Sequence, residues 1–315
     1  MIVVTGGAGF IGSNLVHAIN RRGRDDIIVV EDLTDGQKCL NLADCRIADY
    51  FDCDEWLRLI VSDGGRDLGI ECVYHLGACS DTTAGDGRAM MATNFSYSRA
   101  VFEYCTRNHI ALVYASSAAV YGNGTGFSEQ TANERPLNVY GYSKLAFDQF
   151  VRQRLPRVES LVAGVRYFNV YGPREQHKGR MASVAFHLQR QHRQDGRVRL
   201  FTGSHGYGPG EQQRDFVYVD DAVEVTLWLA AQKPAQNGIY NCGSGRAEPF
   251  NAVARATIDW YGGGDIEYVE FPSALTAAYQ AFTQADLARL REAGCHLAMR
   301  DVASGVREYL RWLDS

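Results

Sequence analysis

The residues best suited to acid–base chemistry are a tyrosine and a lysine four positions apart. Tyr140 and Lys144 stand in the segment YGYSK, and side chains at this spacing lie on one face of a helix. A nearby ammonium favours the ionised phenol, so such a tyrosine can take a proton from a hydroxyl group near neutral pH. We therefore expect Tyr140 to be an acid/base residue whose pKa is lowered by Lys144. Tyr121 and Tyr142 have no lysine at the matched spacing.

Two serines follow a predicted strand over residues 111–115. Parallel α/β sheets bind their ligands at the carboxyl ends of strands, where Ser116 and Ser117 stand. A hydroxyl group there would hold a substrate oxygen beside Tyr140. The same residues also suit a helix N-cap or a turn, and the spacing leaves both readings open.

A glycine-rich loop near the amino terminus is typical of dinucleotide binding. Gly7, Gly9 and Gly12 form GAGFIG between a predicted strand at Ile2–Thr5 and a predicted helix at Ile11–Arg22. Glycines at these positions permit the tight turn and let a pyrophosphate approach the helix N-terminus. Glu31, after the next strand, favours NAD through a ribose hydroxyl, whereas Lys38 favours the 2′-phosphate of NADP. The two signals leave the choice of cofactor open.

The elements that must position these residues alternate between strands and helices over the first 170 residues. This order predicts an α/β fold with a doubly wound parallel Rossmann sheet. The expected strands are 2–5, 27–30, 72–76, 111–115 and 160–167, and the expected helices are 11–22, about 90–107 and 138–155.

Beyond Asn169 the pattern becomes richer in loops. Residues 172–180 and 202–214 are glycine-rich and polar, a strand–helix pair is expected at 215–231, and helices near 251–261, 284–293 and 301–313. We therefore expect a smaller α/β C-terminal substrate-binding domain. The predicted domains are 1–168 with about 215–242, which bind the dinucleotide, and about 169–214 with 243–315, which bind the substrate.

Composition excludes several other classes. The 315 residues contain eight cysteines, none of them spaced C-x-x-C, so neither a disulfide framework nor a metal site is expected. A net charge of −5 argues against nucleic-acid binding. The sequence shows neither a signal peptide nor a membrane segment, which predicts a cytoplasmic protein. The chain has only four lysines, at positions 38, 144, 178 and 233.

Several motifs together resemble the extended short-chain dehydrogenase/reductases. They are TGGAGFIG, YASSAAVYG at 114–122, the Tyr140–Lys144 pair and RYFNVYGPR at 166–174. More specific segments resemble the ADP-L-glycero-D-manno-heptose 6-epimerase family nearly end to end. These are HLGACSDTT (75–83), PLNVYGYSK (136–144), REQHKGRMASVAFHL (174–188), RDFVYVDD (214–221) and YQAFTQADL (279–287).

The resemblance implies roles for individual residues. Ser117, rather than Ser116, would act with Tyr140 and Lys144, and Lys178 would be a second acid/base. The implied cofactor-binding residues are Gly7, Gly9, Phe10, Ile11, Gly12, Glu31, Asp32, Lys38, Leu76, Gly77, Ala78, Cys79, Ser80, Asn94, Lys144, Val170 and Lys178. The implied substrate-binding residues are Asn169, Arg180, His187, Phe201, Thr202, Gly203, Ser204, Arg214 and Tyr279.

The activity implied is epimerisation at C-6″ of ADP-D-glycero-D-manno-heptose, through a 6″-ketone, with bound NADP. The product serves lipopolysaccharide core synthesis, and the family implies a homo-oligomer, a homopentamer in resembling proteins. Whether one base or two act is open. The chain departs from the family pattern at Glu31-Asp32, Leu76 and Arg180, and its loop at 205–213 is longer.

Three other functions are known alternatives for such motifs, and the sequence argues against two of them. A UDP-hexose 4-epimerase is the first alternative. A nucleotide-sugar 4,6-dehydratase would need an acidic pair where Ala118-Ala119 stands. A non-catalytic nucleotide sensor would not be expected to keep Ser117, Tyr140 and Lys144 together.

Overall fold

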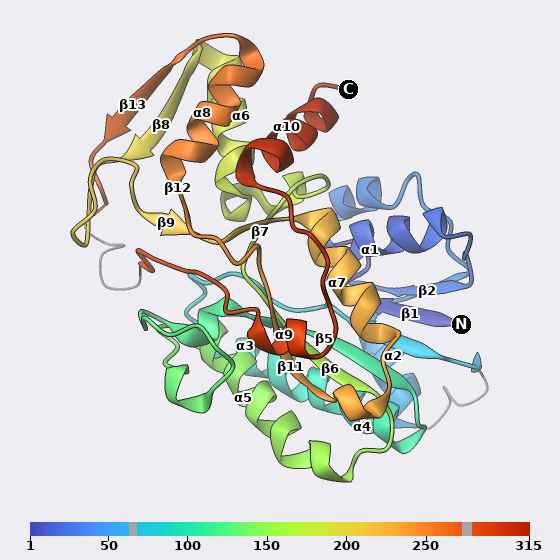
Figure 1. Ribbon diagram of the computed structural model, residues 1–315. Coiled ribbons are helices and arrows are strands. Elements are labelled where there is room, and N and C mark those ends of the chain that lie inside the picture. Colours follow the sequence, from blue (N-terminus) through green and yellow to red (C-terminus); the bar gives the residue numbers. More distant parts are fainter. Residues whose placement is uncertain (63–67, 273–278) are drawn as a thin grey trace. The chain divides into compact units, whose positions relative to one another are not determined.

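The computed structural model describes residues 1–62, 68–272 and 279–315 (Figure 1). Contacts divide the chain into two compact units. The first comprises Met1–Val120, Asn138–Arg166 and Val223–Tyr240, and the second Tyr121–Leu137, Tyr167–Ala222 and Asn241–Ser315. The predicted domain ranges concern which parts fold as independent bodies, and they stay a prediction.

The first unit is built on a seven-stranded sheet. Its order is β11 (Gly238–Cys242), β6 (Val162–Tyr167), β5 (Ala111–Ser117), β4 (Cys72–His75), β1 (Ile2–Thr5), β2 (Ile27–Val30) and β3 (Asp49–Phe51). Strand β1 pairs in parallel with both β2 and β4, so the strand order reverses direction between β1 and β4. This is the order of a doubly wound sheet, and the predicted fold class is confirmed.

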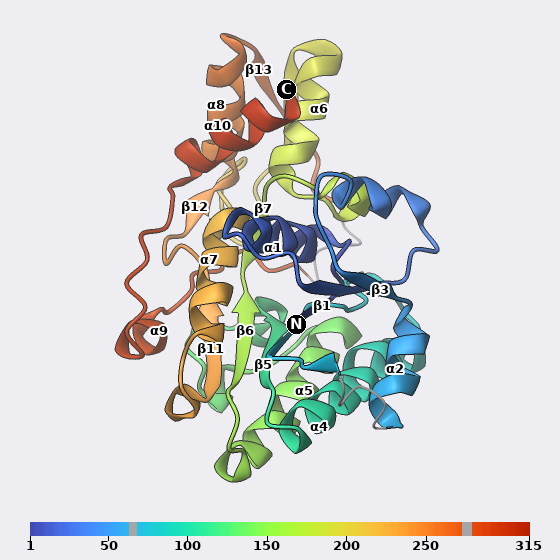
Figure 2. The same cartoon turned by 90° about the vertical axis from the view of Figure 1, so that its right-hand side faces the viewer.

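The central strands are apolar because both faces of the sheet are covered. All four residues of β1 and of β2 are buried. Helices α1 (Phe10–Arg21) and α7 (Val219–Ala230) lie on one face and α4 (Ser98–Arg107) and α5 (Val139–Arg154) on the other (Figure 2). Strands buried on both faces read as continuous runs of branched apolar residues, which is why the sequence predicted them well.

The remaining elements of the first unit are shorter helices and turns. These elements are η1 (Gly36–Asn41), α2 (Cys53–Val61), α3 (Gly87–Met91), η3 (Ala92–Tyr97), η4 (Ala118–Tyr121) and η6 (Leu155–Arg157). Helix α2 was missed although Asp52 caps it and Trp56 and Ile60 form a buried i, i+4 pair. The helix predicted over about 90–107 is interrupted by η3, a π-helical turn that buries Asn94. Such turns add a residue to the helix and often occur at functional sites.

The second unit combines three small sheets with three packed helices. Its pairs are β7 (Asn169–Tyr171) with β10 (Phe216–Tyr218), β9 (Gln213–Arg214) with β12 (Glu248–Pro249), and β8 (Arg197–Phe201) with β13 (Asp265–Val269). The helices α6 (Val184–Asp195), α8 (Phe250–Tyr261) and α10 (Val302–Leu313) share one apolar core with β7, β8, β10 and β13. The shorter elements are η5 (Thr131–Asn133), η7 (Gln176–Met181) and α9 (Ala288–Glu292), while η8 (Pro234–Gln236) belongs to the first unit.

The predicted helix at 284–293 is wrong at its start, because α9 begins only at Ala288. The backbone before it is extended and bonded elsewhere. Thr283 donates its N–H to the Gln213 carbonyl, and the Ala285 N–H donates to the buried carboxylate of Asp215 at 2.9 Å. These tertiary bonds outweigh the local helical pattern. In the part of the chain that the structure describes, no helix is both long and apolar enough to span a bilayer.

Candidate active site

The loop after β1 is shaped by glycines at the point where the strand order reverses. Gly6 has φ of 69°, and a Cβ on it would lie 2.6 Å from the Gly77 nitrogen in the loop after β4. A Cβ on Gly12 would collide with the Gly6 carbonyl oxygen. Helix α1 begins at Phe10, and its N-cap Gly9 has no side chain to bond the first-turn N–H groups. Backbone packed this closely at an open helix N-terminus fits the pyrophosphate of a dinucleotide.

Glu31 and Lys38, which favour different cofactors, contact one another. The buried Glu31 carboxylate accepts hydrogen bonds from the backbone N–H groups of Ala8 and Asp32, both at 3.1 Å. Its Oε1 atom lies 3.2 Å from Lys38 Nζ, which also donates to the Asp32 carbonyl at 3.1 Å. Glu31 therefore ties the glycine loop to the end of β2. Lys38 places a cation at the end of β2, where it could pair with an anionic group of a cofactor.

The loop after β4 is held by a directed chain of buried hydrogen bonds. Ser98 Oγ donates to the Asn94 carbonyl at 2.8 Å, so it accepts from His75 Nε2, also at 2.8 Å. His75 Nδ1 is then an acceptor for Thr5 Oγ1 at 2.7 Å, and Thr5 Oγ1 accepts from the Gly77 N–H at 3.2 Å. Burial lowers the pKa of His75 to about 3, which keeps the ring neutral and this direction of bonds intact.

Asn94 holds the predicted cofactor loop Leu76–Ser80 on its other side. Its amide accepts from the Cys79 N–H at 2.8 Å and donates to the Cys79 carbonyl at 2.9 Å. The amide nitrogen also lies 3.0 Å from Ser143 Oγ on α5. Asn94 thus joins the cofactor loop to the helix that carries Tyr140 and Lys144.

Ser117, Tyr140 and Lys144 come together where α5 packs on the end of β5. Asn138 caps α5 by accepting the Gly141 N–H at 2.8 Å. Two turns of this helix carry half-buried Tyr140 and buried Lys144. Ser117 acts on the Tyr140 hydroxyl and lowers its pKa, and Lys144 Nζ donates to the Ala115 carbonyl at 3.0 Å.

The two serines have different surroundings. Ser116 Oγ donates to the buried Asp148 carboxylate at 2.9 Å. Ser117 Oγ accepts the Ala119 N–H at 3.1 Å and contacts Tyr140. The geometry therefore favours Ser117 as the candidate catalytic serine. The two tyrosines set aside earlier differ as well, since Tyr142 is exposed and buried Tyr121 donates to Asn241 Oδ1 at 2.6 Å.

The expected lowering of the Tyr140 pKa is wrong for this structure. Burial raises the pKa of Tyr140, and Ser117 offsets only part of that rise. The Lys144 ammonium donates to the Ala115 carbonyl rather than to the Tyr140 hydroxyl. Burial instead lowers the pKa of Lys144 to about 8, against the opposing influence of Asp148.

Lys178 lies on η7, a turn in the second unit whose shape depends on a buried carboxylate. Glu175 accepts the N–H and the hydroxyl of Ser183, both at 2.6 Å, and Ser183 in turn caps α6. Gly179, next to Lys178, has φ of 51° and ψ of −122°, which favours glycine. Burial lowers the pKa of Lys178, while Glu175 acts in the opposite direction.

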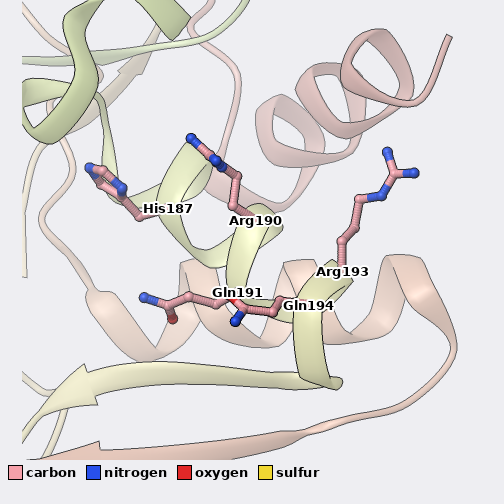
Figure 3. Close-up of a pocket in the computed structure, with 5 residues that line it drawn as sticks. All are labelled: His187, Arg190, Gln191, Arg193 and Gln194. Atoms are coloured by element: carbon pink, nitrogen blue, oxygen red, sulfur yellow. The ribbon is translucent and has the colours of Figure 1, made fainter.

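Arg180 lies on this turn, and His187 lies nearby on α6. His187 Nε2 is 3.3 Å from the Arg180 carbonyl oxygen. His187 also borders an open groove of about 470 Å³ on α6, shared with Arg190, Gln191, Arg193 and Gln194 (Figure 3). Three of these five residues are of basic types, namely His187, Arg190 and Arg193. Arg190 projects beside His187 in the close-up.

An aromatic cluster surrounds the predicted substrate loop Phe201–Ser204. The Arg214 guanidinium lies 4.8 Å from the centre of the Tyr279 ring, and the Tyr279 ring stacks with His205 at 6.0 Å. Phe271 bridges Phe201 and Tyr279 at 5.3 and 4.9 Å. Flat rings beside a buried guanidinium suit a stacked base with an attached phosphate. Asn169 and Val170 stand apart from this cluster on β7, where Thr283 Oγ1 donates to Asn169 Oδ1 at 3.2 Å.

Sequence reasoning missed four buried side chains around these sites: Thr5, His75, Asp148 and Glu175. Asp148 could have been noticed, since it stands four residues after Lys144 on the same helical face. The other three carry no local signal. Among residues 1–62, 68–272 and 279–315, no group of three or more His, Cys, Asp or Glu side chains is arranged to hold a metal ion.

Comparison with known proteins places this site in a family. The NAD dependent epimerase/dehydratase family matches residues 2–243. An ADP-L-glycero-D-manno-heptose-6-epimerase of Alkalilimnicola ehrlichii is 62% identical over 311 residues, covering 98% of this chain and 96% of the relative.

Solved structures agree. The ADP-L-glycero-D-manno-heptose-6-epimerase of Helicobacter pylori is 30% identical with a TM-score of 0.85, covering 100% of this chain and 96% of the other. A UDP-glucose 4-epimerase of Thermotoga maritima, at 24% identity and a TM-score of 0.81, covers 99% and 98% and shares the fold. A nicotinamide dinucleotide is the cofactor class of the matching family. The chain is a member of the NAD dependent epimerase/dehydratase family, and within it of the ADP-L-glycero-D-manno-heptose-6-epimerases.

Proposed function

We propose that this protein converts ADP-D-glycero-D-manno-heptose into ADP-L-glycero-D-manno-heptose by inverting C-6″, with NADP bound throughout. The product supplies heptose for the lipopolysaccharide core. One observation carries the proposal: the relative with this activity in its name is 62% identical over 98% of the chain. Ser117, Tyr140 and Lys144 add a site suited to moving a hydroxyl proton.

The reaction needs a redox step because C-6″ is not adjacent to a carbonyl group, so deprotonation alone cannot invert it. The bound nicotinamide supplies this chemistry by accepting a hydride and returning it. On the protein side, a base must take the proton from the 6″-hydroxyl, and an acid must return one to the oxygen of the 6″-ketone. Return of the hydride to the opposite face of that ketone would give the inverted centre.

Tyr140 is the proposed acid/base at one face of the sugar. Ser117 lowers the pKa of the Tyr140 hydroxyl and stands at the carboxyl end of β5, where doubly wound folds bind their ligands. A buried ammonium at Lys144 stabilises the phenolate that forms when substrate is bound. Burial of Tyr140 makes that stabilisation necessary, since burial raises its pKa.

Lys178 is the proposed second acid/base, acting at the opposite face. Burial lowers its pKa toward the working range, as a lysine that exchanges protons requires. An arginine could not exchange a proton there at neutral pH. That Lys178 and Tyr140 face one another across the substrate is part of the proposal.

The dinucleotide would be held by the loop after β1, the loop after β4 and the β2 end. The glycine cradle and the open N-terminus of α1 would take the pyrophosphate, and Asn94 would hold the Leu76–Ser80 loop in place. We propose NADP rather than NAD because Lys38 places a cation at the end of β2. The same proposal includes a homo-oligomer and a cytoplasmic location.

The substrate would meet the predicted residues of the second unit. Arg214 and Tyr279 would bind the ADP part, since a guanidinium pairs with phosphate and a ring stacks on adenine. The proposed substrate contacts are Asn169, Arg180, His187, Phe201, Thr202, Gly203, Ser204, Arg214 and Tyr279.

The test is turnover of purified protein on a panel of nucleotide sugars. We expect ADP-D-glycero-D-manno-heptose to reach an equilibrium mixture of the two C-6″ epimers, and UDP-galactose to stay unchanged. Conversion of UDP-galactose at a comparable rate would replace the proposal with a UDP-hexose 4-epimerase. Denaturing freshly purified protein should release a nucleotide with the mass of NADP.

A further inference from the structure

Four buried polar side chains meet beneath Lys144. Asp148 on α5, Arg166 on β6, and Tyr114 and Ser116 on β5 are each at most 3% exposed. The Asp148 Oδ2 atom accepts from Arg166 Nε at 2.9 Å, from Arg166 Nη2 at 2.8 Å and from Ser116 Oγ at 2.9 Å. Its Oδ1 atom accepts from the Tyr114 hydroxyl at 3.0 Å. The carboxylate therefore joins one helix to two strands.

Stability alone does not account for this cluster. A fully buried ion pair loses most of its Coulomb attraction to desolvation, and apolar replacements of equal volume are often as stable. The surroundings are apolar and aromatic, with Phe147 and Val162 in the same core. A charged cluster in such surroundings indicates a role in the neighbouring Lys144 site rather than in stability.

The contacts between α5 and β5 occupy neighbouring residues of the strand. Along β5, Tyr114 and Ser116 donate to Asp148, and the Ala115 carbonyl accepts from Lys144. Ser117 follows directly as the last residue of β5 and lowers the pKa of Tyr140 on α5. Asp148 therefore fixes α5 to the strand residues that directly precede the candidate catalytic serine.

We propose that Asp148 is a positioning residue for this site. Its carboxylate, fixed by Arg166 and Ser116, sets the register of α5 on β5 and keeps the ammonium of Lys144 charged. The inference rests on the proposed function for the step that it serves. It assigns Asp148 no contact with substrate or cofactor.

The charge around Lys144 supports this role. Asp148, one helical turn away, raises the pKa of Lys144 against the lowering by burial, and Cys79 in the loop after β4 acts in the same direction as Asp148. Neutral His75 on β4 and the un-ionised Tyr140 on α5 are the other titratable groups around it. Arg166 on β6 balances the charge of Asp148. Removing the Asp148 charge takes the carboxylate away from both Lys144 and Arg166.

The small number of lysines permits a direct measurement. Protein labelled with ¹³C at lysine Cε should give four signals, since the chain has four lysines, and Lys144→Met identifies one of them. We expect Asp148→Asn to lower the Lys144 pKa by about one unit. That shift alone would reduce the charged fraction of Lys144 at pH 7 by less than about twofold. We expect kcat to fall about tenfold or more, mainly because α5 is displaced on β5, with KM changed less.

Two further variants separate positioning from loss of stability. Ser116→Ala keeps the charge but removes a bond between α5 and β5, so it should lower kcat a few-fold while the Lys144 signal titrates as in wild type. Asp221→Asn is the matched control, because Asp221 is a buried carboxylate paired with Arg300 in the second unit. It should lower the melting temperature without moving the Lys144 titration.

Each result decides the matter. An Asp148→Asn protein with wild-type kcat and an unmoved Lys144 titration would overturn the proposal, as would the same shift in Asp221→Asn. If Asp148→Asn does not fold, wild-type kcat in Ser116→Ala overturns the register role. The titration needs no substrate. A wild-type protein without turnover would therefore refute the proposed function while the Lys144 measurement still tests Asp148.

Discussion

The two lysines with proposed catalytic roles, Lys144 and Lys178, are held by different kinds of backbone. Lys144 lies inside the 16-residue helix α5, is 4% exposed, and is bonded to a strand of the main sheet. Lys178 lies half-buried on the six-residue turn η7, next to a glycine with φ of 51°. A regular element packed on a sheet fixes the first lysine, whereas one turn with an unusual dihedral fixes the second.

The acidic neighbours of the two lysines differ in the same way. Asp148 is balanced by the Arg166 guanidinium across two elements. Glu175 is balanced by hydrogen bonds from Ser183, eight residues along the chain. The Lys144 region thus depends on tertiary packing and the Lys178 region on local bonds. We expect the Lys178 turn to be the more easily displaced of the two.

The largest effects should come from removing the acid/base groups themselves. Tyr140→Phe should lower kcat about 10²–10⁴-fold, the usual contribution of a positioned proton-transfer group. Under the two-base scheme, Lys178→Met should lower kcat by a comparable factor, measured as single-turnover epimer formation. Lys233→Met, on a turn before Pro234, is the matched lysine control and should leave kcat unchanged.

The double variant sharpens this comparison. If Tyr140 and Lys178 serve the two faces of one ketone, loss of either already blocks turnover, so the combined variant should be little worse than the single ones. A Lys178→Met protein with near-wild-type kcat would rule out the two-base scheme. Tyr140 would then have to serve both faces.

Glu175→Gln should disturb the Lys178 turn through its local bonds. A glutamine amide brings two donors to a place where Ser183 already donates both its N–H and its hydroxyl. One buried donor loses its partner, which should lower the free energy of unfolding by about 1–3 kcal/mol. Misplacement of Lys178 should lower kcat about tenfold or more. Chemical denaturation and steady-state kinetics check the two effects, and unchanged kcat with lowered stability would show that the turn keeps its shape without the carboxylate.

The fold was predictable from sequence where local pattern and final structure agree. The glycine loop between β1 and α1 was predictable because strand, turn and helix signals are contiguous in Gly6–Gly12. The spacing of Tyr140 and Lys144 survives as an i, i+4 pair on α5. Both features depend on residues within one helical turn or one loop.

The parts that were not predictable depend on contacts between distant residues. Asp148 on α5 contacts Arg166 on strand β6, and Thr5 contacts His75, which lies seventy positions along the chain. The Tyr140 pKa also follows from tertiary structure, because burial, and not the lysine on its own helix, sets the direction of its shift. The extended backbone before α9 is set by buried Asp215 in the same way.

The pH dependence of kcat should show whether the charge of Lys144 is needed. Lys144 has a pKa of about 8 and is charged below that pH. If its ammonium is needed, kcat should fall up to about tenfold per pH unit above pH 8, and this decline should vanish in Lys144→Met. The decline cannot come from unfolding through this group. Its folded pKa lies below the ordinary value of 10.5, so its deprotonation between pH 8 and 10.5 raises stability. A wild-type kcat that stays constant up to pH 10 would contradict the requirement for a charged Lys144.

The smallest predicted effect tests whether backbone strain beside Lys178 matters for turnover. A Cβ on Gly179 would meet no atom within 4 Å, so Gly179→Ala adds no clash, only an unfavourable φ of 51°. Gly196, with φ of 73° after α6 and equally open space, is the matched control. The Gly196 variant, whose backbone is in the left-handed helical region, should lose about 1 kcal/mol of unfolding free energy, and Gly179→Ala, whose ψ of −122° lies outside that region, should lose more. Only Gly179→Ala should also lower kcat, by a few-fold, because relief of its strain moves Lys178. Equal kcat in the two variants would show that Lys178 tolerates movement of its turn, and the contrast with the rigidly held Lys144 would then lie in structure alone.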